Sequence, residues 1–186
     1  DALDIPIILY NIPLFTQPLS YDLVKRLARR DNVVGMKDSS GSMVDFLHFI
    51  DKIQIIGEDI NIMTGREEML FPCLMVGGRG CMTATSGILP EIMIGIYEAW
   101  KAGEYEKAKE LQFSILLAVR GMFAMTFPLG FKFGMELRGF AMGPPKQPLS
   151  DAERFKFNTM KSRIEKIMNP ILTKLDKVSK ETRKAV

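Results

Sequence analysis

Short apolar segments alternate with segments of helical periodicity through the first hundred residues. Ile5–Tyr10 is apolar throughout, which predicts a strand covered on both faces. Apolar positions then recur at helical spacing from Leu19 to Ala28, with Ser20 placed as a cap. Val33–Lys37 is a second apolar run and a second predicted strand. The chain therefore begins as strand, helix, strand.

The same alternation continues to about residue 102. Met43, Leu47 and Ile50 lie on one face of the next predicted helix. Residues 53–56 and 60–63 are both strand-like, and we favour 60–64 as the third strand. The remaining predictions are a helix over 66–76, a turn over 77–80, a fourth strand over 80–84, and a helix opened by Pro90 at its first turn.

After Gly103 the pattern changes to long helical stretches. These are predicted over 105–126, 131–139 and 151–168, with a break at 143–145. Strands alternating with helices indicate parallel βαβ units, but four strands are too few for a closed barrel of ~250 residues. The pattern alone predicts an α/β fold, with βα units over 1–102 and a helical region over 103–186. It does not distinguish half a barrel from a small open sheet.

Composition narrows the class of protein. The 186 residues are 47% apolar and 25% charged, enough for one domain with a core. A net charge of +3, scattered along the chain, argues against nucleic acid or an anionic membrane as partner. No apolar run reaches the ~18 residues of a membrane span. Cys73 and Cys81 have no metal or redox spacing, so we expect reduced, buried thiols in a cytoplasmic protein.

The start of the chain carries its own expectation. Asp1 is not an initiator methionine, and the first predicted strand begins within a few residues of it. Because natural N-termini seldom open directly into a core, we expect further sequence upstream.

Lys37 is the first candidate for chemistry, since it ends an apolar strand in a Gly-Met-Lys-Asp-Ser-Ser-Gly segment. Sites in parallel α/β folds form at the carboxyl ends of strands. An amine pointing into a covered sheet loses solvation, which favours the uncharged, nucleophilic form that attacks ketones. The alternatives are a lysine that reaches solvent at the strand end or pairs with Asp38.

Tyr10 is the second candidate, at the end of the first strand. Its phenol can relay protons, or it can be a core ring with the hydroxyl at the rim. Gly65 follows the third strand and permits close backbone approach to a ligand. Glu67 and Glu68 can accept hydrogen bonds from substrate hydroxyls, or they simply favour the first turn of a helix. His48 is predicted to be a structural or surface residue, and no set of metal ligands is evident.

The order of these segments resembles the dihydrodipicolinate synthase / N-acetylneuraminate lyase family. The resemblance rests on the Tyr-Asn-Ile-Pro segment at 10–13, the Lys37 segment, Thr64-Gly65, the glycine-rich 77–80 and the tail motifs at 103–108 and 143–149. It covers nearly the whole chain, from the family's fifth barrel strand to its end. It implies the C-terminal half of a (β/α)8 TIM barrel with a helical appendage, usually in a homotetramer; for this chain we expect a dimer or tetramer.

The resemblance also implies roles for particular residues. Lys37 would form a Schiff base with pyruvate or another 2-oxo acid, with no metal or organic cofactor, and Tyr10 would relay protons. Ser39, Gly65 and the backbone of Met82 would line the substrate pocket. The two acidic residues, Glu67 and Glu68, match positions that contact the hydroxylated chain of the substrate in the sialic acid lyase branch.

Two departures from the family pattern matter. The family's paired-hydroxyl motif belongs to its N-terminal half and is absent from this sequence, so we expect this chain alone to be an incomplete catalyst. The synthases usually carry an arginine two residues after the proline of the tyrosine motif, where this chain has Phe15. An apolar ring cannot hold a carboxylate in a bidentate contact.

Three functions therefore stay open from the sequence. The first is an aldolase or lyase that makes or breaks a C–C bond beside a lysine imine, with small 2-oxo acids and aldehydes as substrates. The second is a 4-hydroxy-tetrahydrodipicolinate synthase, which condenses pyruvate with aspartate semialdehyde. The third is a non-catalytic half-barrel used for binding or assembly.

Overall fold

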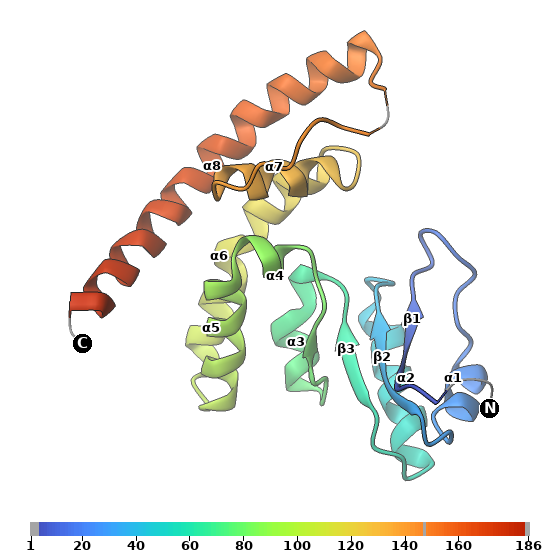
Figure 1. Ribbon diagram of the computed structural model, residues 1–186. Helices are drawn as coiled ribbons and strands as arrows, with labels where there is room; N and C mark the ends of the chain where they lie inside the picture. Colours follow the sequence, from blue (N-terminus) through green and yellow to red (C-terminus); the bar gives the residue numbers. More distant parts are fainter. Residues whose placement is uncertain (1–3, 147, 185–186) are drawn as a thin grey trace. The chain divides into compact units, whose positions relative to one another are not determined.

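The computed structural model describes residues 4–146 and 148–184, with the backbone alone over 178–184. Strands and helices alternate through the first half of the chain and helices follow (Figure 1). In chain order the elements are β1 (Ile7–Asn11), α1 (Tyr21–Leu27), β2 (Val33–Asp38), α2 (Met43–Ile55), β3 (Asn61–Thr64), the 3₁₀ turn η1 (Glu67–Met69), α3 (Leu70–Met75), β4 (Gly80–Cys81), α4 (Thr85–Ile88), α5 (Pro90–Lys101), α6 (Tyr105–Phe123), α7 (Leu129–Leu137) and α8 (Asp151–Lys184).

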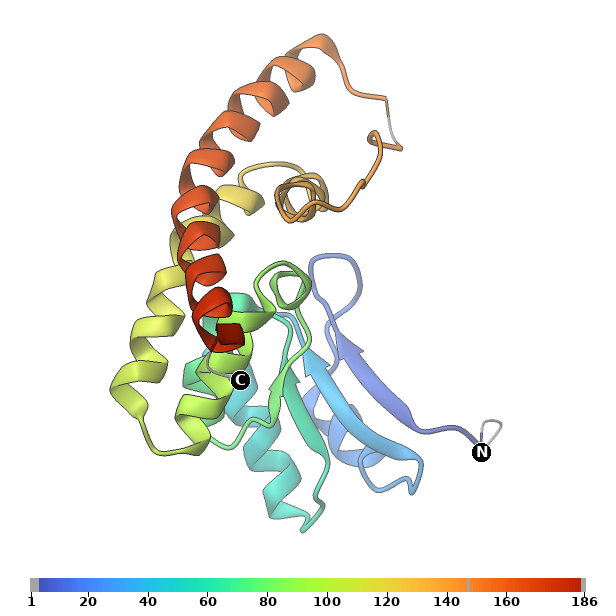
Figure 2. The same ribbon diagram turned by 60° about the vertical axis from the view of Figure 1, so that its left-hand side comes forward.

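The four strands form one parallel sheet in the order β1-β2-β3-β4. Each strand lies beside the next one along the chain, as in successive βα units of a barrel. Helices α1 and α2 cover one face of this sheet (Figures 1 and 2). The α/β prediction with four parallel strands is confirmed, and all four carboxyl ends lie at the same edge.

The described chain falls into two compact units. The first comprises Asp1–Thr83 with Ile94–Gln112, and the second comprises Ala84–Met93 with Phe113–Val186. The first unit holds the whole sheet. Its core lies between the sheet and the helices, where Met36 and Ile62 from the strands meet Phe46 and Phe49 of α2. The assignment of βα units to 1–102 and of a helical region to 103–186 stays a prediction.

The second unit is helical. The start of α7 passes so close to α6 that a Cβ at Gly130 would lie 2.0 Å from the Met122 carbonyl oxygen. Glycine is therefore required there, because the contact is with backbone. Surface ion pairs join Arg138 to Glu91 and Lys161 to Glu136.

Several predicted boundaries were wrong. Strand β1 begins at Ile7 rather than Ile5, whose side chain is exposed. Of the two strand-like segments, the favoured one forms β3, and residues 53–55 end α2, because Ile53 continues the buried face of that helix. Strand β4 stops at Cys81, since the chain turns into α4 from Thr85. Helix α8 continues to Lys184, past the predicted end at 168.

The helical boundaries differ for local reasons. The helix predicted over 66–76 is a 3₁₀ turn followed by α3, with Pro72 in the first turn of α3, where a missing N–H costs little. Ser20 caps α1 as predicted, accepting from the Leu23 N–H. The glycine-rich 77–80 segment is the predicted helix-to-strand turn, with positive φ at Gly77 and Gly80.

One face of β1 and β2 is open, which corrects the prediction of strands covered on both sides. Ile8 is 43% exposed, while Met36 on the opposite face is fully buried. In the described part of the chain, no helix has both the length and the apolar character that crossing a bilayer requires.

Candidate active site

The strand register places Tyr10 and Lys37 side by side at the carboxyl edge of the sheet. Tyr10 pairs with Lys37, and Lys37 pairs with Met63 on the next strand. Met63 in turn pairs with Gly80. Side chains alternate between faces along a strand, so this row shares one face, the open one. The two candidates that the sequence separates by 27 positions are therefore neighbours.

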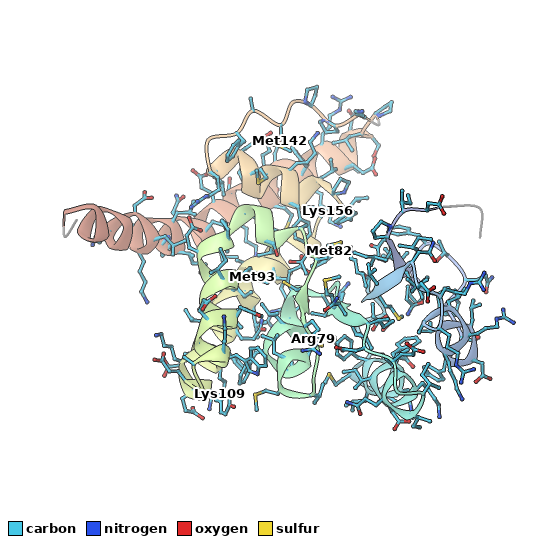
Figure 3. All side chains as sticks on the ribbon, turned by 60° about the horizontal axis from the view of Figure 1, so that its bottom comes forward. Arg79, Met82, Met93, Lys109, Met142 and Lys156 are labelled. Carbon is cyan, nitrogen blue, oxygen red and sulfur yellow. The ribbon has the colours of Figure 1, made fainter. Side chains whose placement is uncertain are left out.

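The backbone ladder extends past the ends of the strands and adds three more predicted residues to the same face. The Ser39 N–H donates to the Asn11 carbonyl (2.8 Å), Gly65 to Asp38 (2.7 Å) and Met82 to Thr64 (2.9 Å). Each of these residues lies two positions beyond a member of the Lys37 row, and alternation returns it to that face. Figure 3 labels Arg79 and Met82, which come just before and just after β4.

The Lys37 amine lies over the Tyr10 ring, with Nζ 4.2 Å from the ring centroid. This is cation–π distance, and it holds the amine against the ring of the proposed proton relay. Tyr10 is 47% exposed and Lys37 is half-buried. Lys37 is therefore only partly buried in this chain, which corrects the expectation of a lysine enclosed in a sheet covered on both faces.

Gly65 allows the third strand end to close on the lysine. A Cβ built at this position would lie 1.9 Å from Ser39 Oγ and 2.8 Å from Lys37 Cε. Both distances are far shorter than van der Waals contact, so a side chain here would displace both neighbours. Lys37, Ser39 and Gly65 thus form one tightly packed group on the open face.

The opposite face carries a buried polar row directly behind this group. Asn11 and Asp38 are 2% and 1% exposed, and Thr64 is completely buried. The Asp38 carboxylate accepts from Asn11 Nδ2 (2.7 Å), Ser40 Oγ (2.8 Å) and the Ser40 N–H (3.1 Å). Asp38 therefore bonds to Asn11 and Ser40 on the helix-covered side of the sheet, and not to Lys37 as one alternative had it.

The two acidic candidates lie in the turn that follows β3. Glu67 and Glu68 begin the 3₁₀ turn η1, where acidic residues were alternatively expected to favour a helix start. Glu67 is 2% exposed. Glu68 is half-buried, with Oε2 3.9 Å from Arg66 Nε and beyond hydrogen-bond distance of any partner. Their role toward a substrate stays a prediction.

Gln112 of α6 holds this turn from behind. Its Nε2 donates to the Glu67 carbonyl (2.9 Å), and its Oε1 accepts from the Phe71 N–H (2.9 Å). The side chain is 3% exposed, so both bonds are shielded from water. A residue from the predicted helical region thereby fixes the loop that follows β3. Helical periodicity alone gave no signal for this role.

The two cysteines and the histidine have surroundings that indicate no catalytic role. Cys73 is buried, and burial raises the pKa of its thiol to about 12. Cys81 is only half-buried, which corrects its predicted burial. His48 is exposed on α2, with its ring 5.2 Å from that of Tyr21, as predicted for a structural residue. Among the described residues, no group of three His, Cys, Asp or Glu side chains is arranged to hold a metal ion.

Residues 1–167 match the model of the dihydrodipicolinate synthetase family. This chain therefore belongs to that family. It is 38% identical over 155 residues to a 4-hydroxy-tetrahydrodipicolinate synthase of Methanoculleus marisnigri, covering 83% of this chain and 53% of the relative. The corresponding enzyme of Methanopyrus kandleri is 34% identical over 169 residues, covering 90% and 55%. The chain spans about half the length of the curated relatives it matches.

Solved structures agree on the fold. An Escherichia coli K12 prophage protein of the dihydrodipicolinic acid synthase family, YagE, determined in complex with pyruvate, superposes with a TM-score of 0.74 at 26% identity, covering 88% of this chain and 57% of that one. A dihydrodipicolinate synthase of Thermotoga maritima gives a TM-score of 0.76 at 22% identity, covering 89% and 56%. These likenesses identify the four strands as part of a TIM barrel.

Proposed function

We propose that this chain supplies the Schiff-base lysine of a lyase or aldolase that acts on pyruvate or another small 2-oxo acid. Lys37 is the nucleophile and Tyr10 is the proton relay. The observation that carries the proposal is the Lys37 amine, 4.2 Å from the Tyr10 ring centroid on the open face of the sheet. Membership of the dihydrodipicolinate synthetase family supports it, as does a relative described in complex with pyruvate.

The proposed reaction follows from the properties of an imine. The Lys37 amine attacks the keto carbon, and the resulting carbinolamine loses water with a proton delivered by Tyr10. Tyr10 then takes the proton of the hydroxyl on the carbon β to the imine, and the bond between the α and β carbons breaks. Its electron pair moves to the protonated imine, which becomes an enamine, and the β carbon leaves as an aldehyde. Protonation of the resulting enamine and addition of water release the 2-oxo acid and restore the free amine. The reverse sequence forms the bond.

The substrate contacts in the proposal come from the same face. Ser39 lies two residues beyond Lys37, and the backbone beyond β4 at Met82 completes the row. Gly65 leaves the space between them free of a side chain. Glu67 and Glu68 are proposed to approach the hydroxylated part of a longer substrate from the turn that follows β3. No cofactor takes part, since the imine itself accepts the electrons.

Borohydride reduction of an imine tests the proposal. The product of the complete reading frame is incubated with pyruvate and sodium borohydride, and its intact mass is measured. We expect the mass of one reduced pyruvate adduct in the wild type and in K52R, and no added mass in K37R. Lys52 is a matched control because it is a partly exposed lysine on the neighbouring helix α2. A wild-type protein without adduct contradicts the proposal and leaves a role in binding or assembly.

A second function, 4-hydroxy-tetrahydrodipicolinate synthase, is favoured by the names of the curated relatives. Phe15 argues against it, because an apolar ring replaces the arginine expected for binding a carboxylate. Phe15 is 65% exposed, so arginine fits there without repacking. Condensation with aspartate semialdehyde in the wild type would favour the synthase. If instead only F15R condenses this aldehyde while the wild type acts on uncharged aldehydes, the aldolase is favoured.

The assembly and location of the protein are also proposals. We expect a soluble, cytoplasmic homo-oligomer, a dimer or tetramer, as the family resemblance implies. Sedimentation velocity of the product of the complete reading frame tests the assembly, and a monomer across the micromolar range would contradict it.

A further inference from the structure

The strongest feature that the proposed reaction does not use is the buried polar row behind Lys37. Asn11 follows Tyr10 directly, and Asp38 follows Lys37 directly, so each polar residue is next to a proposed catalytic residue but on the opposite face. The row lies on the helix-covered side, and neither side chain is accessible to a substrate on the open face. Any effect on chemistry must therefore act through position.

The hydrogen bonds around Asn11 fix the orientation of its amide. The Leu19 N–H donates to Asn11 Oδ1 (3.0 Å), so the amide oxygen points toward the loop that follows β1. Asn11 Nδ2 is then left to donate to Asp38 Oδ1 (2.7 Å). A carboxylate can only accept hydrogen bonds, so Asp38 can bond to the Asn11 amide only when Nδ2 faces it. The pair ties the end of β1, and the loop beyond it, to the end of β2.

The carboxylate also organises the loop beyond β2. Ser40 donates to it twice, from its hydroxyl and from its backbone N–H. Ser40 Oγ in turn accepts from the Ser42 N–H (3.2 Å), just before α2. Ser39 lies between two residues that this network holds, and its own N–H bonds to the Asn11 carbonyl. No ion pair to Asp38 is found among the described residues, so its charge is stabilised by these donors.

The Asn11–Asp38 bond lies on the strand pair that carries both proposed catalytic residues. Tyr10 pairs with Lys37 and Asn11 pairs with Asp38 in the β1–β2 register. The distance between Tyr10 and Lys37 is therefore set by one strand pair, and the Asn11–Asp38 bond is the side-chain link across that pair at its carboxyl end. Hydrogen bonds in a buried, water-free setting are stronger than exposed ones, so the link resists fraying.

We propose that Asn11 and Asp38 are positioning residues that hold the Tyr10 phenol over the Lys37 amine and fix Ser39 beside it. This inference rests on the proposed function of Lys37 and Tyr10. It assigns no chemistry to the buried pair. Instead, the hydrogen bond from Asn11 on β1 to Asp38 on β2 fixes how the two strand ends lie, and thereby the distance between Tyr10 and Lys37 on the open face.

A reciprocal exchange tests the proposal. N11D places two carboxylates face to face, which repel each other in a buried site. The double variant N11D/D38N restores one donor and one acceptor with reversed polarity. Its carboxylate on β1 still accepts from the Leu19 N–H, and its amide oxygen on β2 still accepts from the Ser40 hydroxyl. The Ser40 N–H loses its acceptor, because in the wild type it shares Asp38 Oδ1 with Asn11. N61D is the matched control, because Asn61 is an exposed asparagine on β3 that donates to the Val34 carbonyl.

Two readouts are measured on the product of the complete reading frame. The first is the rate of borohydride trapping at saturating pyruvate, together with the pyruvate concentration that gives half this rate. The second is the ¹⁹F resonance of 3-fluorotyrosine at position 10, identified by its absence in Y10F. It reports the surroundings of the ring whether or not pyruvate reacts.

We expect N11D to lower the saturating rate about a hundredfold and to shift the Tyr10 resonance, since misplacement of about 1 Å costs this much. The double variant should recover at least tenfold of the lost rate and move the Tyr10 resonance back toward its wild-type position, since it restores the link between positions 11 and 38 but not the Ser40 N–H bond. The pyruvate concentration that gives half the saturating rate should change far less than the rate itself. N61D should have the wild-type rate and the wild-type Tyr10 resonance. An unchanged rate and resonance in N11D would overturn the proposal, as would a folded double variant that recovers neither.

Two further outcomes, a variant that does not fold and a wild type that traps no pyruvate, also test the positioning role. If N11D alone does not fold, N11A is compared with the wild type. N11A removes the donor to Asp38 without adding a charge. A lower trapping rate with a shifted Tyr10 resonance in N11A supports the proposal, and wild-type values of both overturn it. If the wild type traps no pyruvate, the proposed function fails. The Tyr10 resonance then decides the positioning role by itself, through its shift in N11D and its return in the double variant.

Discussion

The two faces of the sheet at its carboxyl edge use neighbouring residues for opposite purposes. On the open face, Tyr10 is half-exposed and lies against the Lys37 amine. On the covered face, Asn11 and Asp38 are buried and bonded to each other. One strand pair therefore presents two rows of side chains, one residue out of phase: the row that we propose is reactive on the open face, and a buried, hydrogen-bonded row on the covered face. The comparison between the two faces leads to our proposal that the buried Asn11–Asp38 pair fixes the position of Lys37, which is only partly buried.

The largest effect is expected from replacing the amine. K37R keeps a positive charge but lacks the nucleophile that forms an imine, because the arginine guanidinium stays protonated. We expect turnover below about one thousandth of the wild type, as for loss of other covalent nucleophiles. The midpoint of thermal unfolding should change little, since Lys37 is half-buried on the open face. K52R turnover at the wild-type level completes the comparison, and appreciable turnover in K37R would place the chemistry elsewhere.

The next effect concerns the phenol. Y10F keeps the ring under the amine but removes the proton relay, so we expect turnover to fall about a hundredfold. Tyr105→Phe is the matched control, because Tyr105 is 48% exposed and Tyr10 is 47% exposed. Steady-state kinetics compare the two variants. Equal activity in both would remove Tyr10 from the mechanism.

Gly65 tests how closely the open face is packed. In G65A the new methyl group would overlap Ser39 Oγ and Lys37 Cε, and both flexible side chains must move away. We expect a tenfold to hundredfold loss of the trapping rate, about what misplacement of a catalytic group costs. The loss of stability should be small, since no backbone atom is in the way. G87A is the control, as the space around Gly87 is open. A fully active G65A would show that the group tolerates rearrangement.

The apolar core on the covered face should respond in stability rather than in chemistry, unlike the polar pair beside it. M36A removes a fully buried side chain of the core and should cost about 2–5 kcal/mol of unfolding free energy. M75A should cost much less, because Met75 is 47% exposed. Urea unfolding gives both values, and the trapping rate per folded molecule should stay at the wild-type level. A large fall in the trapping rate per folded M36A molecule would contradict the assignment of this core residue to stability alone.

The smallest effect is a pH dependence from Cys73 on the covered side. Burial raises the pKa of its thiol from 9.0 to about 12, so the folded state holds the proton more tightly than the unfolded state. The stabilisation is fully present below pH 9 and is lost as pH rises toward 12. We therefore expect the urea midpoint of the wild type to fall more steeply above pH 9 than that of C73A. C81A should keep the wild-type slope; equal slopes in all three proteins would contradict this.

Much of this arrangement could be predicted from the sequence. Apolar runs separated by helix-period segments gave four strands, and motif order placed Lys37 and Tyr10 at strand ends. The pairing of Tyr10 with Lys37 follows once the strands are adjacent and in register. Alternation along the strands would also have placed Asn11 and Asp38 on the opposite face from their neighbours, a signal that the sequence contained.

Other features depend on tertiary packing that local pattern does not encode. An apolar strand predicts burial on both faces, yet the exposure of Ile8 depends on what else covers the sheet. Gln112 lies 45 residues from Glu67, and a glutamine within a helix gives no sign of a long-range bond. The end of α2 resembled a strand because Ile53, Ile55 and Ile56 are β-branched, but the buried helical face prevailed over that propensity.

Peptide mapping of the borohydride-trapped protein is the most direct test of the reactive row. After reduction in the presence of pyruvate and proteolysis, tandem mass spectrometry identifies the modified residue. The adduct is expected on Lys37, in the peptide that also contains Asp38 and Ser39. An adduct on any other lysine, with Lys37 unmodified, would contradict the assignment of the open face as the reactive one.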